Sequence, residues 1–122
     1  MKKIFAVDDE YDLLFTIKKV VEFYNKDYSV TTIDSGKKLF NLLEKTIPDL
    51  ILLDIMIPDI NGWEIFNKLK TNLKWKKIPV IFISSVADDT SKITANSIGD
   101  DFIEKPFDAE LLQRKIRYFL KK

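Results

Sequence analysis

Five short apolar runs, each followed by a segment with apolar residues at helical spacing, constrain the fold of this chain more than any other feature. The runs cover residues 3–7, 28–33, 49–54, 79–84 and 101–105. A strand followed by a helix, repeated without a linker or an internal repeat, predicts an α/β fold with one doubly wound parallel sheet. We expect the 122 residues to form a single domain over positions 1–122.

Capping residues predict where several helices begin. Ser35 precedes the second helix and Asp108 precedes the last, and both are residue types that cap helix N-termini. Asn61 opens the pattern NGWE, which resembles a capping box for a helix that extends to about Asn72. A further helix is expected over residues 87–98.

Composition excludes several classes of function. The chain has no cysteine and no histidine, so disulfides, thiolate nucleophiles, histidine ligands and Ser-His-Asp triads are impossible. A net charge of +1 gives no field that would attract nucleic acid or an anionic membrane. No apolar run approaches the ~18 residues of a membrane span, and the N-terminal run is too short for the core of a signal peptide. We therefore expect a cytoplasmic protein without direct nucleic-acid or membrane contacts.

Polar residues follow the predicted strands at the ends where a doubly wound sheet binds its ligands. They are Asp8, Asp9 and Glu10 after the first strand, Asp54 at the end of the third, Ser84 at the end of the fourth and Lys105 after the fifth. Converging carboxylates repel by ~1 kcal/mol per pair at 4 Å in water and by more near a protein surface, so a cation is expected. Mg²⁺ suits such oxygen ligands, and the backbone carbonyl of Met56 would supply one more.

The same acids argue against a mononucleotide site of the flavodoxin type, because a phosphate at the first strand would meet three carboxylates. An anion that arrives together with the metal would explain Ser84 and Lys105. A hydroxyl and an ammonium are donors for phosphoryl oxygens that the metal does not cover.

Four segments of the sequence resemble the response-regulator receiver domain, the CheY-like module of two-component signalling. They are VDDE at 7–10, LLDIMIPDINGWE at 52–64, PVIFISS at 79–85 and EKPFD at 104–108, in the order found in that family. The resemblance covers essentially the whole chain. It implies a flavodoxin-like, CheY-like (βα)5 sheet with the strand order 2-1-3-4-5.

The resemblance also implies roles for most of the polar residues at the strand ends. Asp54 would accept a phosphoryl group, and Ser84 and Lys105 would contact it. Glu10 has no such role, and from its position we expect it only to favour the N-terminus of the first helix. Mg²⁺ or Mn²⁺ would be held by Asp8, Asp9, Asp54 and the carbonyl of Met56, with Asp9 as a direct ligand. The donor would be the phosphohistidine of a sensor histidine kinase or phosphotransfer protein, or a small phosphodonor.

Ser84 and Phe102 are the expected switch residues. Phosphoryl oxygens would draw Ser84 inward and let Phe102 move, which changes the face formed by the fourth helix, the fifth strand and the last helix. Phe102 has no hydroxyl, so its movement would change packing only. This face would control a downstream effector or a fused output domain, and it would support a phosphorylation-dependent dimer.

Met56 and Val86 predict how long the phosphorylated state lasts. Both are apolar at positions where polar side chains in the family help a water molecule reach the phosphoaspartate. We therefore expect slow loss of the phosphoryl group.

Two other interpretations remain open at this stage. One is an Mg²⁺-dependent phosphohydrolase that works through Asp54. Such enzymes generally need a second acid two residues after the nucleophile to protonate the leaving group, and the presence of Met56 at that position disfavours this interpretation. A phosphate-independent interaction module is disfavoured by the complete set of polar residues at the strand ends. We expect the chain to catalyse only its own phosphorylation and dephosphorylation. It would be either a stand-alone regulator or a receiver domain within a longer chain.

Overall fold

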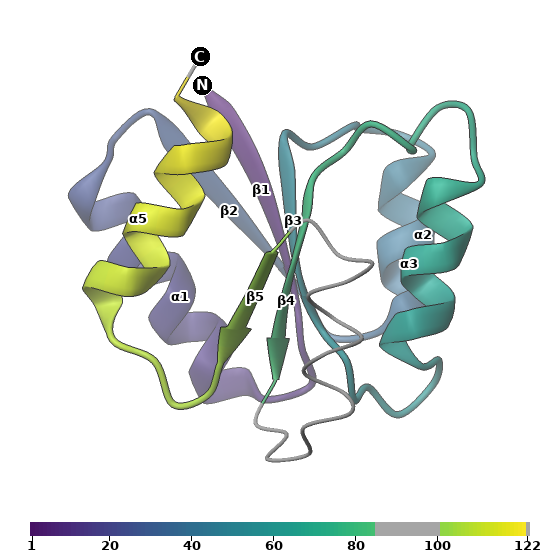
Figure 1. The fold of residues 1–122 in the computed structure, drawn as a ribbon, viewed down its shortest axis with the longest axis horizontal. Helices are drawn as coiled ribbons and strands as arrows, with labels where there is room; N and C mark the ends of the chain where they lie inside the picture. Colours follow the sequence, from purple (N-terminus) through teal and green to yellow (C-terminus); the bar gives the residue numbers. More distant parts are fainter. Residues whose placement is uncertain (85–100, 122) are drawn as a thin grey trace.

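The computed structural model describes residues 1–84 and 101–121 and has a parallel sheet at its centre (Figure 1). Its five strands lie in the order β2-β1-β3-β4-β5. They are β1 (Lys2–Val7), β2 (Tyr28–Ile33), β3 (Leu50–Asp54), β4 (Val80–Ser84) and β5 (Asp101–Glu104). The predicted doubly wound fold and its strand order are confirmed.

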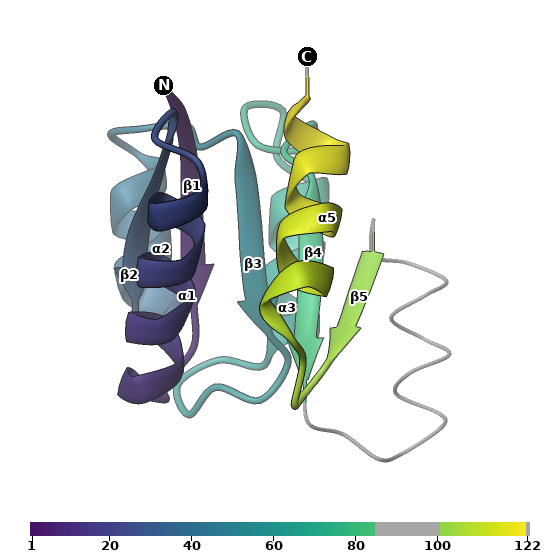
Figure 2. The ribbon, with the colours of Figure 1, turned by 90° about the vertical axis from the view of Figure 1, so that its left-hand side faces the viewer.

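Helices cover both faces of the sheet (Figures 1 and 2). On one face lie α1 (Tyr11–Tyr24) and α5 (Ala109–Leu120), and on the other lie α2 (Gly36–Leu43) and α3 (Gly62–Lys70). The helix predicted over 87–98 lies outside the described residues. In the part of the chain that the structure describes, no helix is both long and apolar enough to cross a bilayer.

The central strand β3 contributes to both hydrophobic cores because successive side chains of a strand point to opposite faces. Leu50 and Leu52 pack in the core under α1 and α5, whereas Ile51 and Leu53 pack in the core under α2 and α3. All four are essentially inaccessible to solvent. Full burial of one such side chain contributes about 2 kcal/mol, so the strand is held firmly up to its last residue, Asp54.

The N-caps predicted at Ser35 and Asp108 are present. The hydroxyl of Ser35 accepts a hydrogen bond from the amide of Lys38 (3.2 Å), and the carboxylate of Asp108 accepts one from Leu111 (2.7 Å). Asn61 also caps its helix, but its side chain accepts a hydrogen bond from the amide of Trp63 (2.7 Å) and not from that of Glu64, as a capping box would require. The third helix ends at Lys70 rather than near Asn72. There the side chain of Asn72 accepts a hydrogen bond from the amide of Lys74, and such local bonds compete with the helix.

Because all five strands are parallel, their carboxyl ends meet at one edge of the sheet, the lower edge in Figure 1. The polar residues predicted at the strand ends are therefore brought to the same edge.

Candidate functional site

Asp54 is a buried acid at the carboxyl edge of the sheet. It is the last residue of β3 and is only 5% exposed. Its Oδ1 accepts a hydrogen bond from the backbone amide of Met56 (3.2 Å). Burial and the negative charge of Asp8 raise the pKa of Asp54 to about 6, although Lys105 and the Met56 amide act in the opposite direction. The carboxylate is therefore ionised at neutral pH, but at a cost in free energy.

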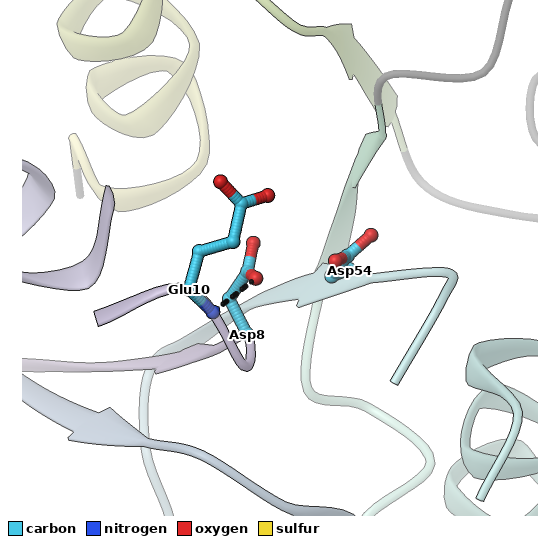
Figure 3. Close-up of side chains that lie close together, drawn as sticks. All are labelled: Asp8, Glu10 and Asp54. Carbon is cyan, nitrogen blue, oxygen red and sulfur yellow. Dashed lines mark hydrogen bonds between the residues drawn. The ribbon is translucent and has the colours of Figure 1, made fainter. Parts of the chain in front are cut away.

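Asp8 lies next to Asp54 and is also buried, with 3% of its surface exposed. It directly follows β1, and its backbone amide donates to the carbonyl of Ile33 (3.0 Å), which continues the pairing of β1 with β2. Its Oδ1 accepts a hydrogen bond from the amide of Glu10 (3.0 Å), as Figure 3 shows. This turn directs the side chain of Glu10 toward the same site.

The ammonium group of Lys105 forms ion pairs with all three acids, Asp8, Glu10 and Asp54. Its Nζ lies 2.9 Å from Asp8 Oδ2, 3.0 Å from Glu10 Oε1 and 3.5 Å from Asp54 Oδ2. Burial alone would lower the pKa of this ammonium, but the hydrogen bonds to Asp8 and Glu10 and the charge of Asp54 outweigh it. The pKa of Lys105 is therefore raised above its ordinary value, and the side chain stays charged.

Ser84 and Lys105 come from neighbouring strand ends. Ser84 is fully buried at the end of β4 and pairs in register with Glu104 of β5. The carbonyl of Ser84 accepts a hydrogen bond from the amide of Lys105 (2.8 Å). The peptide bond between Lys105 and Pro106 is cis.

Phe102 is buried in β5, with its side chain in the core under α2 and α3. It therefore faces inward in this structure. The predicted movement of Phe102 on phosphorylation stays a prediction.

The acidic residues could hold a metal ion. One carboxylate oxygen from each of Asp8, Glu10 and Asp54 lies within 4.8 Å of the other two. Figure 3 shows these three side chains at the carboxyl edge of the sheet. Oxygen donors of this kind suit a hard divalent cation. Asp9 is exposed and is not in this group; with Met56 it lines a shallow depression beside it. The predicted role of Asp9 as the direct ligand stays a prediction.

Glu10 is the residue that the sequence interpretation underestimated. It was expected only to favour the N-terminus of α1, and it does occupy the N-cap position, but its side chain makes no capping hydrogen bond. Its carboxylate contacts Lys105 instead. The available signal was its position two residues after Asp8, where a tight turn can direct both side chains to one side.

A doubly wound sheet of this strand order, with a buried aspartate, further acids and a lysine at its carboxyl edge, defines the CheY-like class of α/β proteins. The sequence model of the response regulator receiver domain matches residues 4–117. The chain belongs to this family, and membership implies a part in phosphorylation-based two-component signalling. Receiver domains are generally not classical enzymes.

Several curated relatives are similar over almost the whole chain. Response regulator ArlR of Staphylococcus saprophyticus is 38% identical over 123 residues, which cover 100% of this chain and 54% of the relative. Transcriptional regulatory protein CrdR of Helicobacter pylori is 33% identical over 119 residues, which cover 97% of this chain and 54% of the relative. The chain thus spans about half the length of these relatives.

Solved structures agree with this assignment. The BeF3-activated receiver domain of DrrB superposes with a TM-score of 0.87 at 28% identity, covering 100% of this chain and 99% of that one. Chemotaxis response regulator CheY4 of Vibrio cholerae has a TM-score of 0.85 at 21% identity, covering 98% of both chains, and supports the fold alone.

Proposed function

We propose that residues 1–122 form one phosphorylation-activated receiver domain in which Asp54 accepts the phosphoryl group. The observation that carries this proposal is the buried carboxylate of Asp54, with the ammonium of Lys105 3.5 Å away and the acids Asp8 and Glu10 beside it. A buried acid with a raised pKa and a specific charged partner is a frequent mark of a functional site.

The phosphoryl donor is the phosphohistidine of a sensor kinase or phosphotransfer protein, or a small phosphodonor. One carboxylate oxygen of Asp54 attacks phosphorus in line, and an O–P bond forms as the bond from phosphorus to the leaving atom of the donor breaks. This atom is nitrogen in phosphohistidine or a phosphoramidate and oxygen in an acyl phosphate. Lys105 neutralises charge on the phosphoryl oxygens, and the hydroxyl of Ser84 donates to another of them. Catalysis is therefore positioning and electrostatic stabilisation, and the chain acts only on its own phosphorylation and dephosphorylation.

The residues present fit a divalent metal. Mg²⁺ or Mn²⁺ would be held by Asp8, Asp9, Asp54 and the carbonyl of Met56, and when bound it supplies positive charge to the transferring phosphoryl group. The same acids carry an excess of negative charge that Lys105 alone does not balance. This imbalance supports a second cation at the site.

Phosphorylation would be transmitted through Ser84 and Phe102 to the face formed by β5, α5 and residues 87–98. In the described part of this face, Lys115 of α5 donates to both carboxylate oxygens of Asp101 at the start of β5 (2.9 and 3.0 Å). The face would control a downstream effector or an output domain in the same protein, and it would support a phosphorylation-dependent dimer in the cytoplasm.

Intact-mass spectrometry after incubation with a small acyl phosphate or phosphoramidate tests the function. We expect a single phosphoryl adduct that requires Mg²⁺, is lost in EDTA and is absent from the Asp54→Asn variant. The same protein with Glu64→Gln serves as a control, because Glu64 is an exposed acid in the first turn of α3. Folded wild-type protein without an adduct would instead support a phosphate-independent interaction module.

Loss of the phosphoryl group is expected to be slow, because Met56 presents an apolar side chain, 68% exposed, beside Asp54. Met56→Asn combined with Val86→Glu would place polar groups that orient an attacking water. We expect decay on the order of tenfold faster, which corresponds to about 1.4 kcal/mol of transition-state stabilisation. The decay of the adduct mass with time measures this, and an unchanged rate would contradict the prediction. Val86 lies outside the described residues.

A further inference from the structure

The segment between β3 and α3 follows directly after the proposed phosphoacceptor, Asp54, and carries the proposed carbonyl ligand of the metal. It runs along the carboxyl edge of the sheet (Figure 2). One acid of this segment, Asp59, reaches across to a different element. Its two carboxylate oxygens accept hydrogen bonds from the amides of Gly36 (3.0 Å) and Lys37 (3.1 Å) at the start of α2. These contacts join positions more than 20 residues apart in the sequence.

Asp59 accepts hydrogen bonds from two of the amides at the N-terminus of α2. The first four amides of a helix have no partner inside the helix. In α2 the amide of Lys38 bonds to the side chain of Ser35, and the amides of Gly36 and Lys37 bond to Asp59. The first hydrogen bond within the helix runs from the amide of Leu39 to the carbonyl of Ser35. The amides of Gly36 and Lys37 also hold the pKa of Asp59 below its ordinary value, so the carboxylate is charged at neutral pH.

Packing strengthens this connection. A Cβ atom at Gly36 would overlap the side chain of Ile60, the residue after Asp59, so the start of α2 lies directly against the segment. At its far end the segment is closed by a hydrogen bond from the amide of Gly62 to the carbonyl of Ile55 (2.8 Å). Met56 therefore lies between two anchored points.

We propose that Asp59 is a positioning residue, which clamps the segment after β3 to the N-terminus of α2 and so holds the backbone carbonyl of Met56 in place for the metal. Asp59 does not contact the metal or the phosphoryl group in this arrangement. The inference rests on the proposed function, because it concerns the same metal site. Asp59 would affect metal binding by fixing the position of the segment between β3 and α3, without supplying a ligand atom itself.

Calorimetric titration with MgCl2 alone tests the clamp. We expect Asp59→Ala to bind Mg²⁺ about tenfold more weakly than wild type, as is typical when a residue that orients a metal ligand is lost. Asp59→Asn retains one acceptor oxygen and should give an intermediate affinity. Ser35→Ala is the matched control, because it removes a cap from the same helix end without touching the segment after β3.

Urea unfolding in EDTA separates positioning from stability. Both Asp59→Ala and Ser35→Ala should lower the unfolding midpoint, but only Asp59→Ala should weaken Mg²⁺ binding. Wild-type affinity in Asp59→Ala, or an equal loss in Ser35→Ala, would overturn the clamp while leaving the proposed function intact. Absence of Mg²⁺ binding by the folded wild-type protein would overturn the proposed metal site and the clamp together.

Discussion

Asp54→Asn is expected to stabilise the metal-free protein at neutral pH, even though it removes the proposed phosphoacceptor. Asp54 and Asp8 are both buried, and the ammonium of Lys105 is the charge that offsets them. The pKa of Asp54 is about 6 instead of its ordinary 3.8, a difference that corresponds to about 3 kcal/mol of unfavourable free energy when the group is ionised. An amide of the same shape avoids this cost and keeps an oxygen for the amide of Met56.

The expected gain depends on pH in a defined direction. Below the ordinary pKa of 3.8, Asp54 is protonated in both the folded and the unfolded state and contributes nothing. Between 3.8 and about 6 the folded state binds the additional proton, so wild-type stability falls as the pH rises. Above about 6 the full penalty is present. The variant should therefore be more stable by up to about 3 kcal/mol above this range and no more stable below it.

Urea unfolding in EDTA across this pH range measures the difference. Glu64→Gln is a suitable control, since the loss of an exposed negative charge in the first turn of a helix should lower stability by less than about 1 kcal/mol. Added Mg²⁺ should stabilise wild type and have little effect on Asp54→Asn. Equal stability of the two proteins above the pKa of Asp54 would contradict the prediction. It would show that ionising the buried carboxylate costs the folded protein no free energy.

Gly62→Ala is expected to be strongly destabilising, because the first residue of α3 packs against the backbone at the end of β3. A Cβ atom at Gly62 would lie 2.7 Å from the carbonyl oxygen of Asp54 and 2.7 Å from the Cα of Ile55. Neither backbone atom can rotate away as a side chain can, so the start of α3 or the end of β3 must move. We expect a loss of about 3 kcal/mol, at the upper end of the usual cost of overpacking.

Gly36→Ala provides the comparison. A Cβ atom there would overlap the Cγ2 methyl of Ile60, so Ile60 must change its side-chain conformation. Because the nearest atoms belong to the side chains of Ile60 and Ile65 and not to the backbone, a smaller loss than for Gly62→Ala is expected. The free energy of unfolding in urea measures both variants, and phosphorylation by a small donor measures the effect on Asp54. A Gly62→Ala variant as stable as wild type would show that α3 can shift without cost.

The sequence predicted the architecture well because the signals were local. Apolar runs and helical spacing located all five strands and the described helices, with differences of about two residues at some ends. The third strand begins at Leu50 rather than position 49, and the third helix stops at Lys70. Helix ends depend on competing side-chain bonds such as that of Asn72, which periodicity does not contain.

The sequence by itself determined which polar groups follow the strands at the carboxyl edge of the sheet. Because parallel strands end at one edge, Asp8, Asp54, Ser84 and Lys105 had to gather there once the strands were recognised. Only the tertiary structure decided which side chains at this edge contact one another and which residues hold the surrounding segments in place. The turn after β1 brings Glu10 to Lys105, and the packing of α2 brings Gly36 to Asp59. Such contacts depend on the direction of turns and side chains in three dimensions, and a one-dimensional pattern of residue types does not specify that direction.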